Sequence, residues 1–131
     1  MNGAGEAGQR MHGRSVAREA SCAGIGLHTG DRVRVTLRPR AEPGIVFVRE
    51  DLPGHPQVRA CASNVVLERR RTALRDGGGE VHTAEHLLAA LYASGIDAAE
   101  VGLSGPEVPG LDGSAAEWLA VVADAGAAPR P

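Results

Sequence analysis

The alternation of hydrophobic and polar residues is clearest over residues 31–38. Val33, Val35 and Leu37 there alternate with arginines and a threonine, which predicts a β-strand with one face toward the core and one in water. A second apolar run follows at residues 45–49, and a Glu-Pro-Gly sequence typical of a turn separates the two runs. The pattern therefore predicts that these two strands form a hairpin.

Weaker patterns predict further short strands. They are expected over residues 15–22, 58–61, 64–67, 72–75, 80–82 and 101–103. Three consecutive glycines follow Asp76 between two of these segments and supply the positive φ angles that a tight turn requires. This arrangement predicts a second hairpin.

Two segments have the composition and boundaries of helices. Thr83 is the expected N-cap of the first helix, and Gly95 its C-terminal stop. The second helix is expected to open with a capping box from Ser114 to Glu117 and to end at Gly126. Its predicted apolar stripe consists of Trp118, Leu119, Val122 and Ala125.

The order of these elements predicts an α+β fold. We expect a two-layer sandwich in which one mostly antiparallel sheet is covered on one face by two helices. The chain has 131 residues, which fits one domain. We assign residues 14–126 to that domain, 1–13 to a disordered tail and 127–131 to a tail or linker, with Met1 or Met11 as the start.

Composition narrows the function classes. A net charge of −2 and 2% aromatic residues argue against a nucleic-acid binder. No apolar run is long enough for a membrane span, and the N-terminus has no apolar stretch typical of a secretory signal. A cytoplasmic location is therefore expected. The run Arg69-Arg70-Arg71 is interpreted either as a solvated strand face or as a phosphate contact.

Candidate chemistry is concentrated in the sequence His82-Thr83-Ala84-Glu85-His86. If Thr83 caps the helix, Glu85 and His86 lie in the first turn, where the helix dipole favours a carboxylate and a neutral imidazole. A metal ligand beside a base forms a plausible hydrolytic half-site. The alternative is ordinary: an acidic residue that stabilises a helix start beside a solvated histidine.

The same string fits H-x-x-E-H, the pattern of the inverzincin peptidases. That reading needs His82 and His86 on one helix face. With Thr83 as the cap, His82 lies on the strand side instead, so the peptidase reading is disfavoured.

Two other segments attract attention. His28 lies in the glycine-rich segment GIGLHTG, where backbone can approach a ligand closely. The sequence Asp112-Gly113-Ser114 is interpreted as a turn into a helix cap.

Three motifs in order, GIGLHTG, HTAEHLLAALYASGID and GPEVPGLDGSAAEW, resemble the N-terminal half of UDP-3-O-acyl-N-acetylglucosamine deacetylase, a zinc amidohydrolase of lipid A synthesis. The resemblance covers about residues 15–126. It implies that Glu85 is the general base and His86 a Zn²⁺ ligand, that His28 borders the active site and that Thr72 lies near the substrate. It also implies that His82 is not a ligand.

The resemblance further implies that the remaining zinc ligands and a general acid come from a second domain. We therefore expect one of three cases: a truncated enzyme, a split enzyme, or a diverged half. A split enzyme would be completed by a complementary C-terminal domain or by a second copy of the chain in a homo-oligomer. In the third case the chain would be an inactive binding or regulatory module. The acylated UDP-N-acetylglucosamine would be the substrate of the completed enzyme.

Overall fold

A computed structural model describes residues 13–67, 72–110 and 116–131 of the chain. The expected N-terminal tail, apart from Gly13, lies outside the described residues. So do the arginines at 69–71, the turn at 112–114 and the Ser114 capping residue.

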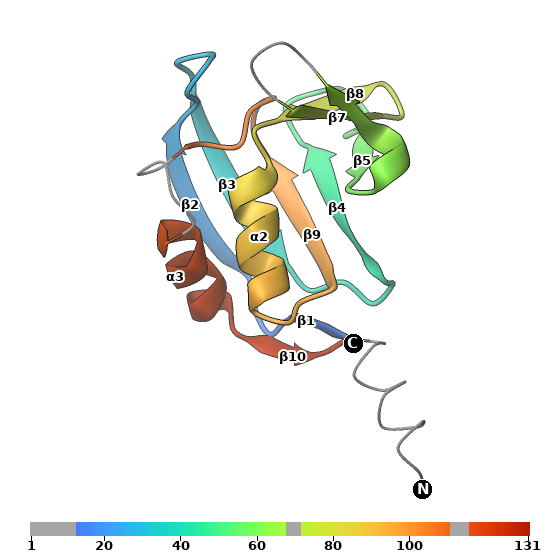
Figure 1. Cartoon of the computed structure of the whole chain (residues 1–131), viewed down its shortest axis with the longest axis vertical. Coiled ribbons are helices and arrows are strands. Elements are labelled where there is room, and N and C mark those ends of the chain that lie inside the picture. The colour runs from blue at the N-terminus through green and yellow to red at the C-terminus, as the bar shows by residue number, and fades with distance from the viewer. Residues whose placement is uncertain (1–12, 68–71, 111–115) are drawn as a thin grey trace, which may run out of the picture.

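The centre of the fold is a five-stranded sheet (Figure 1). Its strands, in spatial order, are β2 (Ala20–Ile25), β3 (Arg32–Arg38), β9 (Ala98–Leu103), β4 (Gly44–Arg49) and β5 (Gln57–Arg59). Strands β4 and β9 pair in parallel, and the other neighbours are antiparallel. The predicted alternation is confirmed, because Val33, Val35 and Leu37 are all buried.

The predicted hairpin between residues 31–38 and 45–49 is wrong. Strand β9 lies between β3 and β4 and pairs with both of them. Five of its six residues are buried, and a strand buried on both faces belongs at the centre of a sheet. Alternation identifies the buried face of a strand but not its neighbour, so the order of the strands could not be read from it.

Two helices cover one face of this sheet, as predicted (Figure 1). Helix α2 (Glu85–Ala93) ends where expected, since Gly95 adopts a φ of 76° and the Ile96 N–H donates to the Leu91 carbonyl at 3.0 Å. In helix α3 (Ala116–Ala125), Trp118 is fully buried. Leu119 is 41% exposed, because the next residue along a helix is rotated by about 100° away from the core.

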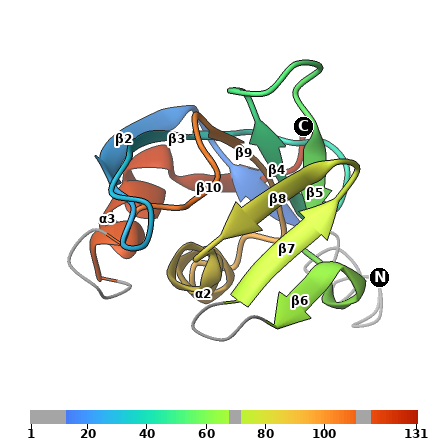
Figure 2. The same cartoon turned by 90° about the horizontal axis from the view of Figure 1, so that it is seen from above.

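Two smaller sheets complete the fold, where one sheet was expected. Strands β6 (Val65–Leu67), β7 (Thr72–Asp76) and β8 (Gly79–His82) form a three-stranded sheet beside α2 (Figure 2). A short 3-10 helix, Ala62–Asn64, precedes β6. The predicted second hairpin is confirmed in β7 and β8, where Gly77 and Gly78 have φ angles of 54° and 84°.

The expectation that residues 127–131 form a tail or linker is wrong, because part of this segment belongs to the third sheet. Strand β10 (Ala127–Pro129) pairs with β1 (Arg14–Val16). The Ala17 N–H also donates to the Gly126 carbonyl at 2.8 Å. The backbone of this segment is satisfied by a partner more than 100 residues earlier, which its own composition does not indicate.

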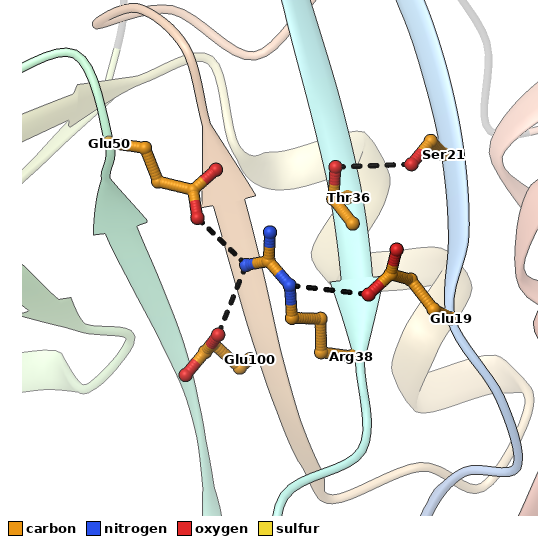
Figure 3. Close-up of polar contacts among 6 residues, drawn as sticks. All are labelled: Glu19, Ser21, Thr36, Arg38, Glu50 and Glu100. Carbon is orange, nitrogen blue, oxygen red and sulfur yellow. Dashed lines mark hydrogen bonds and ion pairs between the residues drawn. The ribbon is translucent and has the colours of Figure 1, made fainter.

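On the face of the main sheet that lacks helices, charged side chains of β3 and β9 contact those of residues next to β2 and β4 (Figure 3). Arg38 Nη1 lies 2.9 Å from Glu50 and 3.1 Å from Glu100, and its Nε lies 3.5 Å from Glu19. These contacts need Gly102, because a Cβ there would come within 2.6 Å of Arg38 Nη1.

Candidate functional site

The candidate site lies where β8 leads into α2. Strand β8 ends at His82, Thr83 has a φ of 62°, and the helix begins at Glu85 with Ala84 as its N-cap. The prediction that Thr83 caps the helix is therefore wrong. Its hydroxyl instead donates a 3.1 Å hydrogen bond to Glu107 Oε2, and a left-handed backbone at a β-branched residue is a strained conformation.

Glu85 and His86 occupy the first turn of α2. Glu85 is exposed and His86 is partly buried, whereas the next residue, Leu87, is completely buried. A carboxylate in a first helical turn interacts favourably with the positive end of the helix dipole. The chain thus presents an exposed carboxylate and a partly buried imidazole at consecutive positions in the first turn of α2.

The carboxylate of Glu107 connects this junction to the turn after β2. It is fully buried. Its Oε2 accepts the His28 N–H at 3.0 Å, and its Oε1 accepts the Thr29 N–H at 3.0 Å. Its Oε2 also accepts the Thr83 hydroxyl. Gly26 makes this approach possible, because a Cβ there would lie 2.4 Å from Glu107 Oε1.

Hydrogen bonding decides the charge state of Glu107. Burial raises the pKa of its carboxyl. The N–H groups of Thr29 and His28, followed by the hydroxyls of Thr29 and Thr83, outweigh burial and lower the pKa below its ordinary value. The residue is therefore a buried carboxylate anion at neutral pH.

Thr83 also connects the site to β7. Its N–H donates to the Thr72 carbonyl at 3.4 Å, and the Thr72 side chain is exposed. His28 is likewise exposed, in the turn at residues 27–29. The Thr72 backbone thus contacts Thr83 directly, and the His28 backbone is linked to Thr83 through the Glu107 carboxylate. Figure 1 shows the turn after β2 and the start of α2 at the same end of the molecule.

Sequence reasoning missed Glu107. No role for residues 106–110 was predicted from the sequence. The available signal was one acidic residue among apolar, proline and glycine residues, a composition in which a charge needs a specific partner. The partners here are mostly backbone N–H groups, which leave no mark on residue identity.

His82 is not part of a helical ligand pair. It is the last residue of β8 and is buried, and its Nε2 lies 3.0 Å from Glu80 Oε1. Its backbone forms a parallel bridge with Glu107. Because His82 and His86 do not share a helix, the inverzincin arrangement is absent, as expected.

The metal chemistry of the described residues is incomplete. No group of three or more histidine, cysteine, aspartate or glutamate side chains gathers among residues 13–67, 72–110 and 116–131. A catalytic zinc ion takes about three protein ligands. The described part of this chain therefore does not fit a complete zinc site by itself. In the same residues, no helix has the length and apolar character needed to cross a bilayer.

The fold and the site together define an α+β domain that presents a carboxylate and an imidazole at the start of a helix. The family model described as "LpxC: UDP-3-O-acyl N-acetylglycosamine deacetylase" matches residues 13–130. The chain belongs to this family.

Curated relatives agree with this assignment. The chain is 50% identical over 114 residues to the UDP-3-O-acyl-N-acetylglucosamine deacetylase of Geobacter sp. (strain M21), covering 86% of the chain and 37% of that protein. It is 50% identical over 115 residues to the protein of the same name from Myxococcus xanthus (strain DK1622), covering 86% and 36%. The bifunctional enzyme LpxC/FabZ of Chlorobaculum tepidum is 42% identical over 119 residues, covering 90% and 26%. The chain thus spans little more than a third of the length of the deacetylases it matches.

Proposed function

We propose that this chain supplies one half of the active site of a zinc-dependent deacetylase. The completed enzyme hydrolyses the N-acetyl group of UDP-3-O-acyl-N-acetylglucosamine in lipid A biosynthesis, in the cytoplasm. The observation that carries the proposal is the accessible Glu85-His86 pair at the start of α2 in a chain of this family.

Glu85 is the group on this chain that moves a proton. Its exposed carboxylate accepts a proton from the water that attacks the acetamide carbonyl carbon. The new carbon–oxygen bond replaces the carbon–nitrogen bond, the nitrogen takes up a proton, and the products are acetate and a free glucosaminyl amine. The exposed residues His28 and Thr72 are the proposed substrate contacts.

His86 is the only zinc ligand that we assign to this chain. The described residues hold no group of three ligands, and we assign the others to a second polypeptide segment. A complementary C-terminal domain is the proposed source, and a second copy of this chain is the alternative.

Reconstitution tests this proposal. The full chain is mixed with the part of the Geobacter sp. deacetylase that it does not match, and release of acetate is measured with and without a zinc chelator. We expect zinc-dependent release that falls about 10²- to 10⁴-fold in Glu85→Gln, the range typical of a lost general base. His86→Ala should lower the zinc affinity of the mixture.

Glu117→Gln is the matched control, because Glu117 is also an exposed glutamate in a first helical turn. It should retain activity. A folded mixture that releases no acetate and binds zinc no better than either component contradicts the proposal.

The second candidate function is a binding module without catalysis. The lack of a three-ligand group among the described residues favours it. Isothermal titrations with zinc and with a UDP-sugar distinguish the two candidate functions. Binding of the sugar to the chain, with no zinc binding even in the mixture, supports the binding module.

A further inference from the structure

Glu107 joins segments that are far apart in the sequence. Its carboxylate binds the His28 N–H, 79 residues away, and the Thr83 hydroxyl, 24 residues away. One carboxylate oxygen, Oε2, accepts both of these donors. The turn after β2 and the start of α2 are therefore fixed to a single atom.

The groups around Glu107 stabilise a negative charge on its carboxylate. Burying an unpaired carboxylate is costly unless hydrogen bonds replace its hydration. Among the described residues, no ion pair involves Glu107. Its buried negative charge is instead stabilised by N–H and hydroxyl donors from the two segments that flank the candidate site.

Two features of the sequence accommodate this carboxylate at a cost. Gly26 leaves a space that any Cβ would fill, 2.4 Å from Glu107 Oε1. Thr83 holds a φ of 62°, which favours glycine or asparagine. Strained residues persist where surrounding contacts over-determine them, and they cluster at functional sites.

We propose that Glu107 is a positioning residue, which holds the turn bearing His28 against the start of the helix bearing Glu85 and His86. It does not itself contact the reacting atoms. The inference rests on the proposed function insofar as the site that it positions is the deacetylase site.

Amide hydrogen exchange on the full chain tests the positioning directly. The Glu107→Gln side chain keeps one acceptor, the amide oxygen. An amide NH₂ group replaces the other oxygen and cannot accept from the N–H donors that it faces. We expect the His28 and Thr29 amides to exchange about tenfold to a hundredfold faster, as for loss of a hydrogen bond to a charged group. The amides of β3 and β9 should keep their protection.

Gly26→Ala displaces the same carboxylate by placing a methyl group against Glu107 Oε1 and should produce the same local loss. It also keeps the test usable if Glu107→Gln does not fold. Glu100→Gln is the matched control, because it removes a carboxylate from the Arg38 cluster on the other face of the sheet. Unchanged exchange at His28 and Thr29 in folded Glu107→Gln and Gly26→Ala overturns the inference.

The reconstituted mixture then tests the link to catalysis. We expect Glu107→Gln and Gly26→Ala to lower kcat, while Glu100→Gln leaves both kcat and KM unchanged. Loosened amides with an unchanged kcat overturn the positioning role in catalysis. If the unsubstituted mixture releases no acetate, the proposed function is wrong, and the exchange data still decide whether Glu107 holds the turn.

Discussion

Replacement of Thr83 by valine isolates one hydrogen bond to the buried Glu107 carboxylate. Valine has the shape of threonine without the hydroxyl, and it is β-branched in the same way. The strain of the φ of 62° is therefore present in both proteins and cancels from the comparison. Only the 3.1 Å bond from Thr83 Oγ1 to Glu107 Oε2 is lost.

The magnitude follows from the charge of the acceptor. A hydrogen bond to a charged group contributes about 1.5–3 kcal/mol to stability. Glu107 keeps the N–H donors of His28 and Thr29, which places the expected loss near the lower part of that range, at about 2 kcal/mol. For a chain of this length the loss corresponds to a decrease in Tm of roughly 8 °C.

Chemical denaturation of the two proteins measures this loss, and Thr36→Val is the matched control. Thr36 is also buried, but its partner is the neutral hydroxyl of Ser21 at 3.1 Å (Figure 3). A neutral hydrogen bond contributes about 1 kcal/mol, and valine suits a strand. If Thr83→Val is no more destabilising than Thr36→Val, the reasoning about the Glu107 charge is refuted.

Two further predictions concern the helix end and acid stability. Gly95→Ala should lower the free energy of unfolding in denaturant by about 1 kcal/mol, since the φ of 76° is strained for alanine while its Cβ meets open space. Gly95→Asn should lower it by less, and equal losses for the two variants contradict the backbone explanation. Hydrogen bonding from Arg49 lowers the pKa of Asp51, so its stabilising contribution is present above the ordinary carboxyl pKa and is lost as the pH falls through the folded value. Asp51→Asn should therefore flatten the acid limb of a stability–pH curve, and an unaltered limb counts against this assignment.

The local features of this fold could be predicted from the sequence. The glycines at 77, 78 and 95 occupy the left-handed conformations that their positions in turns indicated. The alternation at residues 33–37 identified the buried face of β3. Each of these features depends on a few neighbouring residues, so the sequence around it contains the information.

The features that were missed depend on distant partners. Nothing within residues 31–49 indicates that β9 separates the two strands. Nothing in residues 127–129 indicates a pairing with β1. In the site, the Glu85-His86 pair was accessible to sequence reasoning. The role of Thr83 was not, because its hydroxyl partner lies 24 residues away.

The central position of β9 has a consequence for biosynthesis. Until residues 98–103 leave the ribosome, the nascent chain holds two separate β-units, each with an open edge that later pairs with β9. Unpaired edges invite association with other chains. The main sheet closes only after residues 98–103 have been made, so newly made chains depend on this late closure to escape aggregation.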